Sequence, residues 1–187
     1  MENMDKDFLE LAANRYSVRK FIDKPVEQED LDKILKAGYL APTACNRQPQ
    51  RILVINSDEG RAKLKRCTKC HFDAPTALLI CYDKTDCWQR KYDDKISGDI
   101  DASIVTTHMM LEAAATGVGT TWVMHFDPAA VKSEFKVPES YEPTALLIMG
   151  YPAPDAAPFP GHSEFKPLEA LVSYEEFKKN FVHKKIR

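Results

Sequence analysis

The chain has 187 residues, of which 44% are hydrophobic and 29% are charged, and its formal net charge is −2. This length suits a single domain over residues 1–187 with a sizeable core, either alone or as one protomer of an oligomer. Without a basic excess or a run of like charge, the composition argues against nucleic-acid binding and against a membrane surface.

The N-terminal end lacks the pattern of an export signal. Four acidic residues fall among its first ten positions and no apolar run follows, whereas a signal peptide needs basic residues and then an apolar segment. The longest mainly apolar stretch, residues 96–124, is interrupted by Asp99, Asp101, His108 and Glu112, so we do not expect it to span a membrane. We therefore expect a cytoplasmic protein with no membrane or nucleic-acid partner.

Hydrophobic periodicity and turn-forming residues predict an irregular alternation of helices and strands. Helices are expected over residues 5–14, 27–41, 58–66, 97–116, 127–135 and from 173 onward. Strands are expected over residues 51–55, 77–82, 120–126 and 145–151. This order favours an α+β fold in which helices pack on a mixed sheet.

Three features of this pattern bear on assembly. The helix at 97–116 is apolar on almost every side, which places it at the centre of a domain or at a subunit interface. The Pro-rich loop at 152–160 is too long for a simple connection, so we expect it to be functional or to reach a partner. Ser173 and Glu176 have the spacing of a capping box that would open the last helix.

Polar residues in two loops are the first candidates for ligand binding. In RYSVR, Arg15, Ser17 and Arg19 lie two apart, so an extended loop would point them the same way and present forked donors to a phosphate. A solvated basic loop fits the same residues. In APTACNRQP, residues 41–49, the amide of Asn46 offers both a donor and an acceptor to a polar ring, although a turn with ordinary capping groups fits equally well.

Gly117 and Gly119 look like the start of a dinucleotide-binding fingerprint. They follow a helix and precede a strand, which is the reverse of the Rossmann order, and the third glycine is missing. We therefore reject a Rossmann domain. We expect these glycines to end the helix and to let a strand approach something flat.

The cysteines raise the question of a metal or haem. They are Cys45, Cys67, Cys70, Cys81 and Cys87, an odd number that argues against a disulfide framework. CTKCH at residues 67–71 has the spacing that attaches haem in c-type cytochromes, and it also offers zinc ligands. No export signal supports haem attachment, and no H-x-x-x-H pair or carboxylate cluster completes a zinc site. No nucleophile motif stands out either, so we expect no metal, no catalytic side chain in the strict sense, and an organic cofactor.

Taken in order, five segments resemble the nitroreductase-like FMN-dependent oxidoreductase family. They are NRYSVRKF at 14–21, APTACNRQP at 41–49, DASIVTTHMMLEAAATGVGTTWVMHFDP at 101–128, ALLIMGYPA at 145–153 and FKPLEALV at 165–172. The resemblance implies a nitroreductase-like α+β fold, with a central mixed, mainly antiparallel sheet flanked by helices. It also implies an intertwined homodimer in which two FMN sites lie at the subunit interface.

The resemblance also implies three groups of FMN contacts. The first would hold the phosphate and ribityl chain, the second would reach the flavin from the other subunit, and the third would run along the ring. These groups are Arg15, Tyr16, Ser17 and Arg19; Pro42, Thr43, Ala44 and Asn46; and Trp122, Val123, Met124 and His125. Lys166 would add a cation at the phosphate, and the backbone N–H of Met124 would donate to flavin N5.

The family's reaction is a ping-pong hydride transfer. NADH or NADPH reduces the flavin, and a nitroaromatic, a quinone or a related small acceptor then reoxidises it. The resemblance thus implies an NAD(P)H-dependent FMN oxidoreductase whose partners are a second copy of itself and a small-molecule electron acceptor. The alternative is a non-redox flavin-binding or storage protein on the same scaffold.

Two residues depart from the family's pattern, and one question stays open. Cys45 stands where relatives often have a small residue, and Phe165 stands where a second basic residue is common. The phosphate contacts would then depend more on Arg15 and Arg19. CTKCH precedes the strand at 77–82, so Cys67 or Cys70 would lie either beside the flavin or in a plain loop at a helix end.

Overall fold

A computed structural model of the chain describes residues 8–177. Its strands are β1 (Gln50–Ile55), β2 (Thr76–Asp83), β3 (Gly119–Val123) and β4 (Tyr141–Gly150). They form one sheet in the order β1-β2-β4-β3, and every neighbouring pair is antiparallel. A single parallel bridge joins Ser17 to Thr120 at the β3 edge. The expected α+β fold with a mixed, mainly antiparallel sheet is confirmed.

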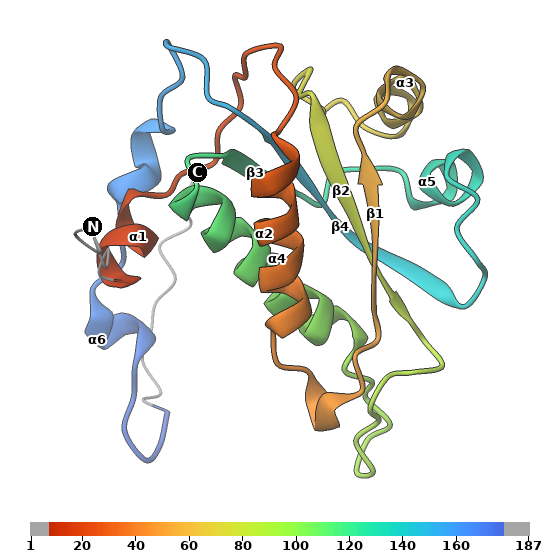
Figure 1. Cartoon of the computed structure of the whole chain (residues 1–187). Coiled ribbons are helices and arrows are strands. Elements are labelled where there is room, and N and C mark those ends of the chain that lie inside the picture. The colour runs from red at the N-terminus through yellow and green to blue at the C-terminus, as the bar shows by residue number, and fades with distance from the viewer. Residues whose placement is uncertain (1–7, 178–187) are drawn as a thin grey trace.

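The helices lie on both faces of this sheet (Figure 1). They are α1 (Phe8–Asn14), α2 (Gln28–Leu40), α3 (Asp58–Cys67), α4 (Gly98–Ala115), α5 (Pro128–Glu134) and α6 (Leu168–Leu171), together with the short 3₁₀ helices η1 (Ala44–Asn46) and η2 (Pro160–Ser163). α2 and α4 cover one face, and α3 and α5 cover the other. Among the described residues, no helix is long and apolar enough to cross a membrane.

Alternation along the central strands builds the two halves of the core. Every residue of β2 is buried, because successive side chains of a strand point to opposite faces and both faces are covered here. Leu78 and Ile80 pack with α2 and α4, whereas Leu79 and Cys81 pack with α3 and α5. This accounts for the uninterrupted apolar sequence of the strand, which shows no period of two.

Helix α4 is less enclosed than its sequence suggests. Its buried face, with Val105 and Met109, packs toward α2, where Gly38 leaves room for the Met109 side chain. Its other side is only partly covered, and Ile100 is 50% exposed. One protomer therefore does not bury this helix all round.

The two ends of the chain differ from the sequence prediction. Residues 5–7 of the first predicted helix lie outside the described residues, and the rest forms α1. The predicted capping box is wrong within residues 173–177, which hold no helical turn. Glu175 has φ = 63°, and a helix beginning at Ser173 would need a negative φ there. The remainder of that predicted helix also lies outside the described residues, while α6 and η2 are too short for a periodic signal.

Candidate functional site

Residues 15–19 run beside β3 as an extension of the sheet. The N–H of Val18 donates to the carbonyl oxygen of Thr120 at 2.9 Å, and the Thr121 hydroxyl donates to the carbonyl oxygen of Val18. A Cβ atom at position 119 would lie 2.7 Å from Cγ2 of Val18, so only glycine allows this approach. The sequence predicted a flat group at this glycine, but within the protomer the branched Val18 side chain lies there, with Pro152 next to it.

The polar side chains of this loop make only long or weak hydrogen bonds within the protomer. Arg19 is exposed and donates to the carbonyl oxygen of Ser17 at 3.2 Å. Nη1 of Arg15 lies 3.8 Å from the sulfur of Met110, a weak acceptor. The hydroxyl of Tyr16 donates to the carbonyl oxygen of Ala156 at 3.5 Å, the limit for a hydrogen bond. These donors are thus available to a stronger acceptor such as a phosphate.

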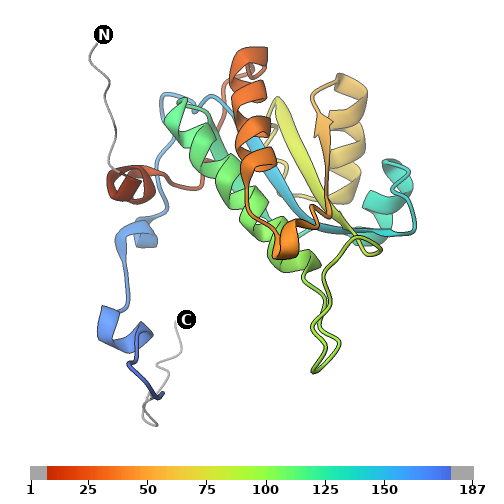
Figure 2. The ribbon, with the colours of Figure 1, turned by 60° about the horizontal axis from the view of Figure 1, so that its bottom comes forward.

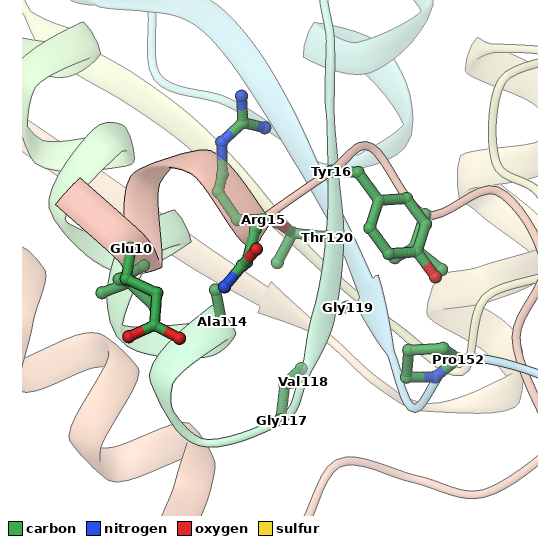
Figure 3. A pocket seen from close by; sticks show the side chains of 12 residues that line it. Glu10, Arg15, Tyr16, Ala114, Gly117, Val118, Gly119, Thr120 and Pro152 are labelled. Carbon is green, nitrogen blue, oxygen red and sulfur yellow. The ribbon is translucent and has the colours of Figure 1, made fainter. Parts of the chain in front are cut away.

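A pocket of about 210 Å³ lies between α1, this loop and the turn from α4 into β3 (Figure 3). Its walls include Leu11, Val18 and Val118, and the carboxylate of Glu10 faces it. In Figure 3 the guanidinium of Arg15 points away from the pocket. An apolar pocket with a carboxylate at its rim does not suit an anionic ligand, so we do not assign the phosphate to it.

Trp122 and Val123 are the last two residues of β3, and Met124 and His125 follow it. The contacts of residues 15–19 are with Thr120 and Thr121, so the structure joins the two predicted groups through β3. The predicted strand over 120–126 is too long, because pairing with β4 stops at Val123. Beyond that point Met124 is 72% exposed, and its carbonyl oxygen accepts the N–H of Phe126 at 3.0 Å. Nε1 of Trp122 is buried with no hydrogen-bond partner among the described residues.

The CTKCH segment borders the same region. The hydroxyl of Thr68 donates to the carbonyl oxygen of His125 at 2.5 Å and accepts the N–H of Cys70 at 2.9 Å. Cys67 is the last residue of α3 and is only 3% exposed, and burial raises the pKa of its thiol. The segment thus contacts residues 122–125 through Thr68, with the Cys67 thiol buried below.

The same geometry gives the haem and zinc interpretations no support. The Cys67 thiol donates to the carbonyl oxygen of Lys63 at 3.3 Å, and such a buried group is poorly placed for covalent attachment. Across residues 8–177, no group of three His, Cys, Asp or Glu side chains gathers as a metal site would require.

The loop at 42–46 lies elsewhere in the protomer. Figures 1 and 2 show it at the C-terminal end of α2, away from α1 and the loop that follows α1. Its backbone is strained, since Cys45 and Asn46 have φ values of 51° and 52° although neither is a glycine. The hydroxyl of Thr43 accepts the N–H of Gln48 at 3.0 Å. One protomer therefore does not bring this second group of predicted residues to the first and third.

Lys166 lies between η2 and α6, in a segment that leads away from the sheet (Figure 2). Its side chain is exposed, and within residues 8–177 no hydrogen bond joins it to residues 15–19. Close to Lys166 in the chain, the ring of His162 makes an edge-to-face contact with the ring of Tyr16, with centroids 6.3 Å apart. Like residues 42–46, Lys166 is not gathered to the loop by the protomer alone.

Sequence reasoning missed one residue of this region. Asp101 is almost completely buried on α4, and its Oδ1 accepts the N–H of Ala44 at 2.9 Å. From the sequence alone, Asp101 counts only as one of the polar residues that interrupt the apolar stretch at 96–124. An acidic residue beside the apolar positions of this helix was nevertheless the available signal, because a buried carboxylate needs specific donors.

The fold and these residues define a small α+β protein with a cation-bearing loop locked to the edge strand of its sheet. A model of the Nitroreductase family matches residues 12–77 and 69–151. These matches cover more than half of the chain, and the chain belongs to this family.

Relatives with solved structures share the fold. A nitroreductase family protein from Clostridium difficile 630 is 44% identical, with a TM-score of 0.86, over 91% of this chain and 99% of that one. An FMN-dependent nitroreductase from Clostridium difficile R20291 is 27% identical, with a TM-score of 0.73, over 89% and 98%. Among curated proteins, an FMN reductase of Bacillus subtilis that uses NAD(P)H is 26% identical over 82% of this chain and 69% of its own length.

Proposed function

We propose that this protein is an FMN-dependent oxidoreductase that takes electrons from NADH or NADPH and passes them to a nitroaromatic, a quinone or a related small acceptor. Residues 1–187 act as one FMN-binding domain of a homodimer. The observation that carries the proposal is the hydrogen bond from Val18 to Thr120, which holds the Arg15 and Arg19 loop against the strand leading to Met124. Family membership and the names of the FMN-using relatives support the cofactor and the electron donor.

The donors along this edge fit FMN. Arg15, Ser17 and Arg19 offer guanidinium and hydroxyl groups to a phosphate, and their present partners are weak. Beyond the end of β3, the backbone at Met124 is no longer paired with β4, so its N–H is available to a polar ring edge. FMN supplies hydride transfer when bound, and the chain's own residues hold it, orient it and leave one face open.

A second copy of the chain completes the site. Residues 42–46 lie too far round the protomer to meet residues 15–19, so we propose that they serve the partner's flavin. Two surfaces support such a dimer. One is the partly exposed side of α4 around Ile100. The other is the segment 153–177, whose Phe165 and Leu168 are exposed although they are large and apolar.

The five cysteines are all free, which suits a reducing compartment, and we propose that the protein acts in the cytoplasm.

Spectroscopy of the purified protein tests the function. After FMN is added and excess removed, we expect a yellow protein whose flavin bands bleach when NADH or NADPH is added without oxygen. Adding a nitroaromatic or a quinone should then restore the bands. A protein that retains no flavin would overturn the proposal, and one that retains flavin without bleaching would instead be the storage protein.

A further inference from the structure

Asp101 links three separate segments at one end of the protomer. Its side chain is 1% exposed in the first turn of α4. Oδ1 accepts the N–H of Ala44 at 2.9 Å, and Oδ2 accepts the hydroxyl of Ser97 at 2.7 Å. The Ser97 oxygen in turn accepts the N–H of Trp88 at 3.2 Å. This bond attaches the hairpin between β2 and α4, residues 89–96, whose ends Gln89 and Ile96 form an antiparallel bridge. Both carboxylate oxygens therefore accept a hydrogen bond, as buried polar atoms require.

The loop that Asp101 holds would not keep its shape unaided. Cys45, Asn46 and Gln48 all have φ near 50°, a conformation that residues with a Cβ rarely adopt. Such strain persists only where surrounding contacts over-determine the backbone. Within residues 8–177, the N–H of Ala44 donates to Asp101 and the N–H of Gln48 donates to the Thr43 hydroxyl. At the far end of the loop, Arg47 donates to the carbonyl oxygen of Asp86 and Arg51 donates to that of Gln48, so Asp101 is the side chain that holds the first half of the loop.

The start of α4 is built to bring the carboxylate to this loop. A Cβ atom at position 98 would lie 2.3 Å from the ring of Tyr82, so Gly98 lets the first helical turn approach the end of β2 closely. Tyr82 is paired with Gln50, the residue that begins β1 shortly after the loop. The positive end of the α4 dipole also favours a carboxylate in its first turn.

From this arrangement, we propose that Asp101 is a positioning residue that holds residues 43–48 in the strained shape needed to contact the flavin of the partner subunit. The inference rests on the proposed function, because it takes residues 42–46 to be flavin contacts. Asp101 touches neither cofactor nor substrate. It acts through the backbone of Ala44, and through Ser97 it fixes the hairpin base against the same loop.

The test compares Asp101→Asn and Asp101→Ala with Asp99→Asn in the dimeric protein. Asp99 lies in the same helical turn, but it accepts the hydroxyl of Thr144 on β4 at 3.0 Å and does not contact the loop. We expect the FMN Kd, measured by quenching of flavin fluorescence, to rise about tenfold in Asp101→Ala, the scale of a lost hydrogen bond to a charged group. Asp101→Asn keeps the shape of the side chain and should give a smaller rise, and Asp99→Asn should leave the Kd unchanged.

Two further readouts separate positioning from general stability. With FMN saturating, the visible circular dichroism of bound flavin should change in both Asp101 variants, because the loop contacts the ring differently. In the apo protein, hydrogen exchange at the Ala44 amide should be fastest in Asp101→Ala, slower in Asp101→Asn, and unchanged in Asp99→Asn. If Asp101→Ala does not fold, Asp101→Asn and Ser97→Ala are compared instead. Ser97→Ala should raise the FMN Kd by an amount between those of Asp99→Asn and Asp101→Ala.

The outcomes distinguish this inference from the function on which it rests. Asp101 variants that match Asp99→Asn in Kd, dichroism and Ala44 exchange would overturn the positioning role while leaving the flavoprotein intact. A wild-type protein that binds no FMN would overturn the function. The Ala44 exchange rate would then still decide whether Asp101 holds the loop.

Discussion

The N–H of Val18 lies 2.9 Å from the carbonyl oxygen of Thr120, and this bond fixes the first loop to the edge of the sheet. The loop carries the cationic side chains, and β3 ends in Trp122 and Val123 and leads to Met124 and His125. Together with the bond from the Thr121 hydroxyl to Val18, this backbone contact sets the distance between the groups that we assign to the phosphate and to the ring.

Gly119 makes this contact possible, so Gly119→Ala should weaken it. Its new Cβ would meet Val18 and Pro152, and such overpacking costs about 1–3 kcal/mol of unfolding free energy. Urea unfolding of the apo protein measures this change. Gly161→Ala is the control, because its Cβ would meet only the ring of Phe159 and the carboxylate of Glu164, which belong to exposed side chains that can move. Equal stability of Gly119→Ala and the wild type would contradict the close approach.

Arg15 is the cation most directly tied to the proposed phosphate contact. Arg15→Ala should weaken FMN binding by about 1.5–3 kcal/mol, the scale of a hydrogen bond to a charged group. Lys20→Ala is the matched control on the same loop, since Lys20 is exposed and paired with Asp155 at 2.6 Å. Fluorescence titration measures both affinities. An unchanged Kd for Arg15→Ala would remove this residue from the site.

The exposed side of α4 offers a test of the dimer. Ile100→Glu should leave the protomer folded, because the side chain is half exposed and an acidic residue suits the first turn of a helix. It should nevertheless weaken dimerisation by about 3 kcal/mol, since a charge would be buried unpaired at the interface. FMN affinity should fall with it.

Sedimentation velocity measures the change in assembly. Leu53→Glu, at a comparably exposed apolar position on β1, should remain dimeric. A dimeric Ile100→Glu protein would place the interface elsewhere.

The cysteines should differ in their reaction with a thiol reagent at neutral pH. Burial raises the pKa of Cys67 and Cys87, and that of Cys81 to about 12, so little reactive thiolate forms at these positions. Cys45 is exposed and should react first, followed by the half-buried Cys70. If Cys45 faces the partner's flavin, FMN should slow its labelling. Mass spectrometry of apo and FMN-bound protein reads each rate, and identical rates for Cys45 in the two forms would place it away from the cofactor.

Asp83 should contribute to stability in a pH-dependent way. Hydrogen bonds from Thr85, with a smaller effect of Arg51, lower the pKa of its carboxyl in the folded protein. A depressed folded pKa stabilises the protein above the unfolded value of about 3.9, and this contribution is lost as the pH falls through the folded value.

The free energy difference between wild type and Asp83→Asn should therefore be constant from pH 7 to 5 and should shrink below about pH 4. Urea unfolding at each pH measures it. Thr85→Val, which removes a donor to the carboxylate, should show the same trend more weakly. A difference that grows with acid would reverse the assigned shift.

Several features could be predicted from sequence because their signals are local. Apolar runs located β2 and β4, and the Asp-Pro pair located the start of α5, where the Asp127 carboxylate accepts the N–H groups of Ala129 and Ala130. Predictions that depend on how a segment pairs with other segments were less accurate. The run at 120–126 looks like one strand throughout, but pairing ends at Val123, and no propensity reveals where a partner strand stops.

By itself, the sequence determined the family, the α+β class and the chemistry of the donors, because motif order and side-chain type are local properties of the chain. Only the tertiary structure decided which of those donors meet. It joined residues 15–19 to β3, left residues 42–46 at another end of the protomer, and buried Asp101 against Ala44. Such contacts depend on how the helices and strands pack, and packing brings together residues that are distant in the chain.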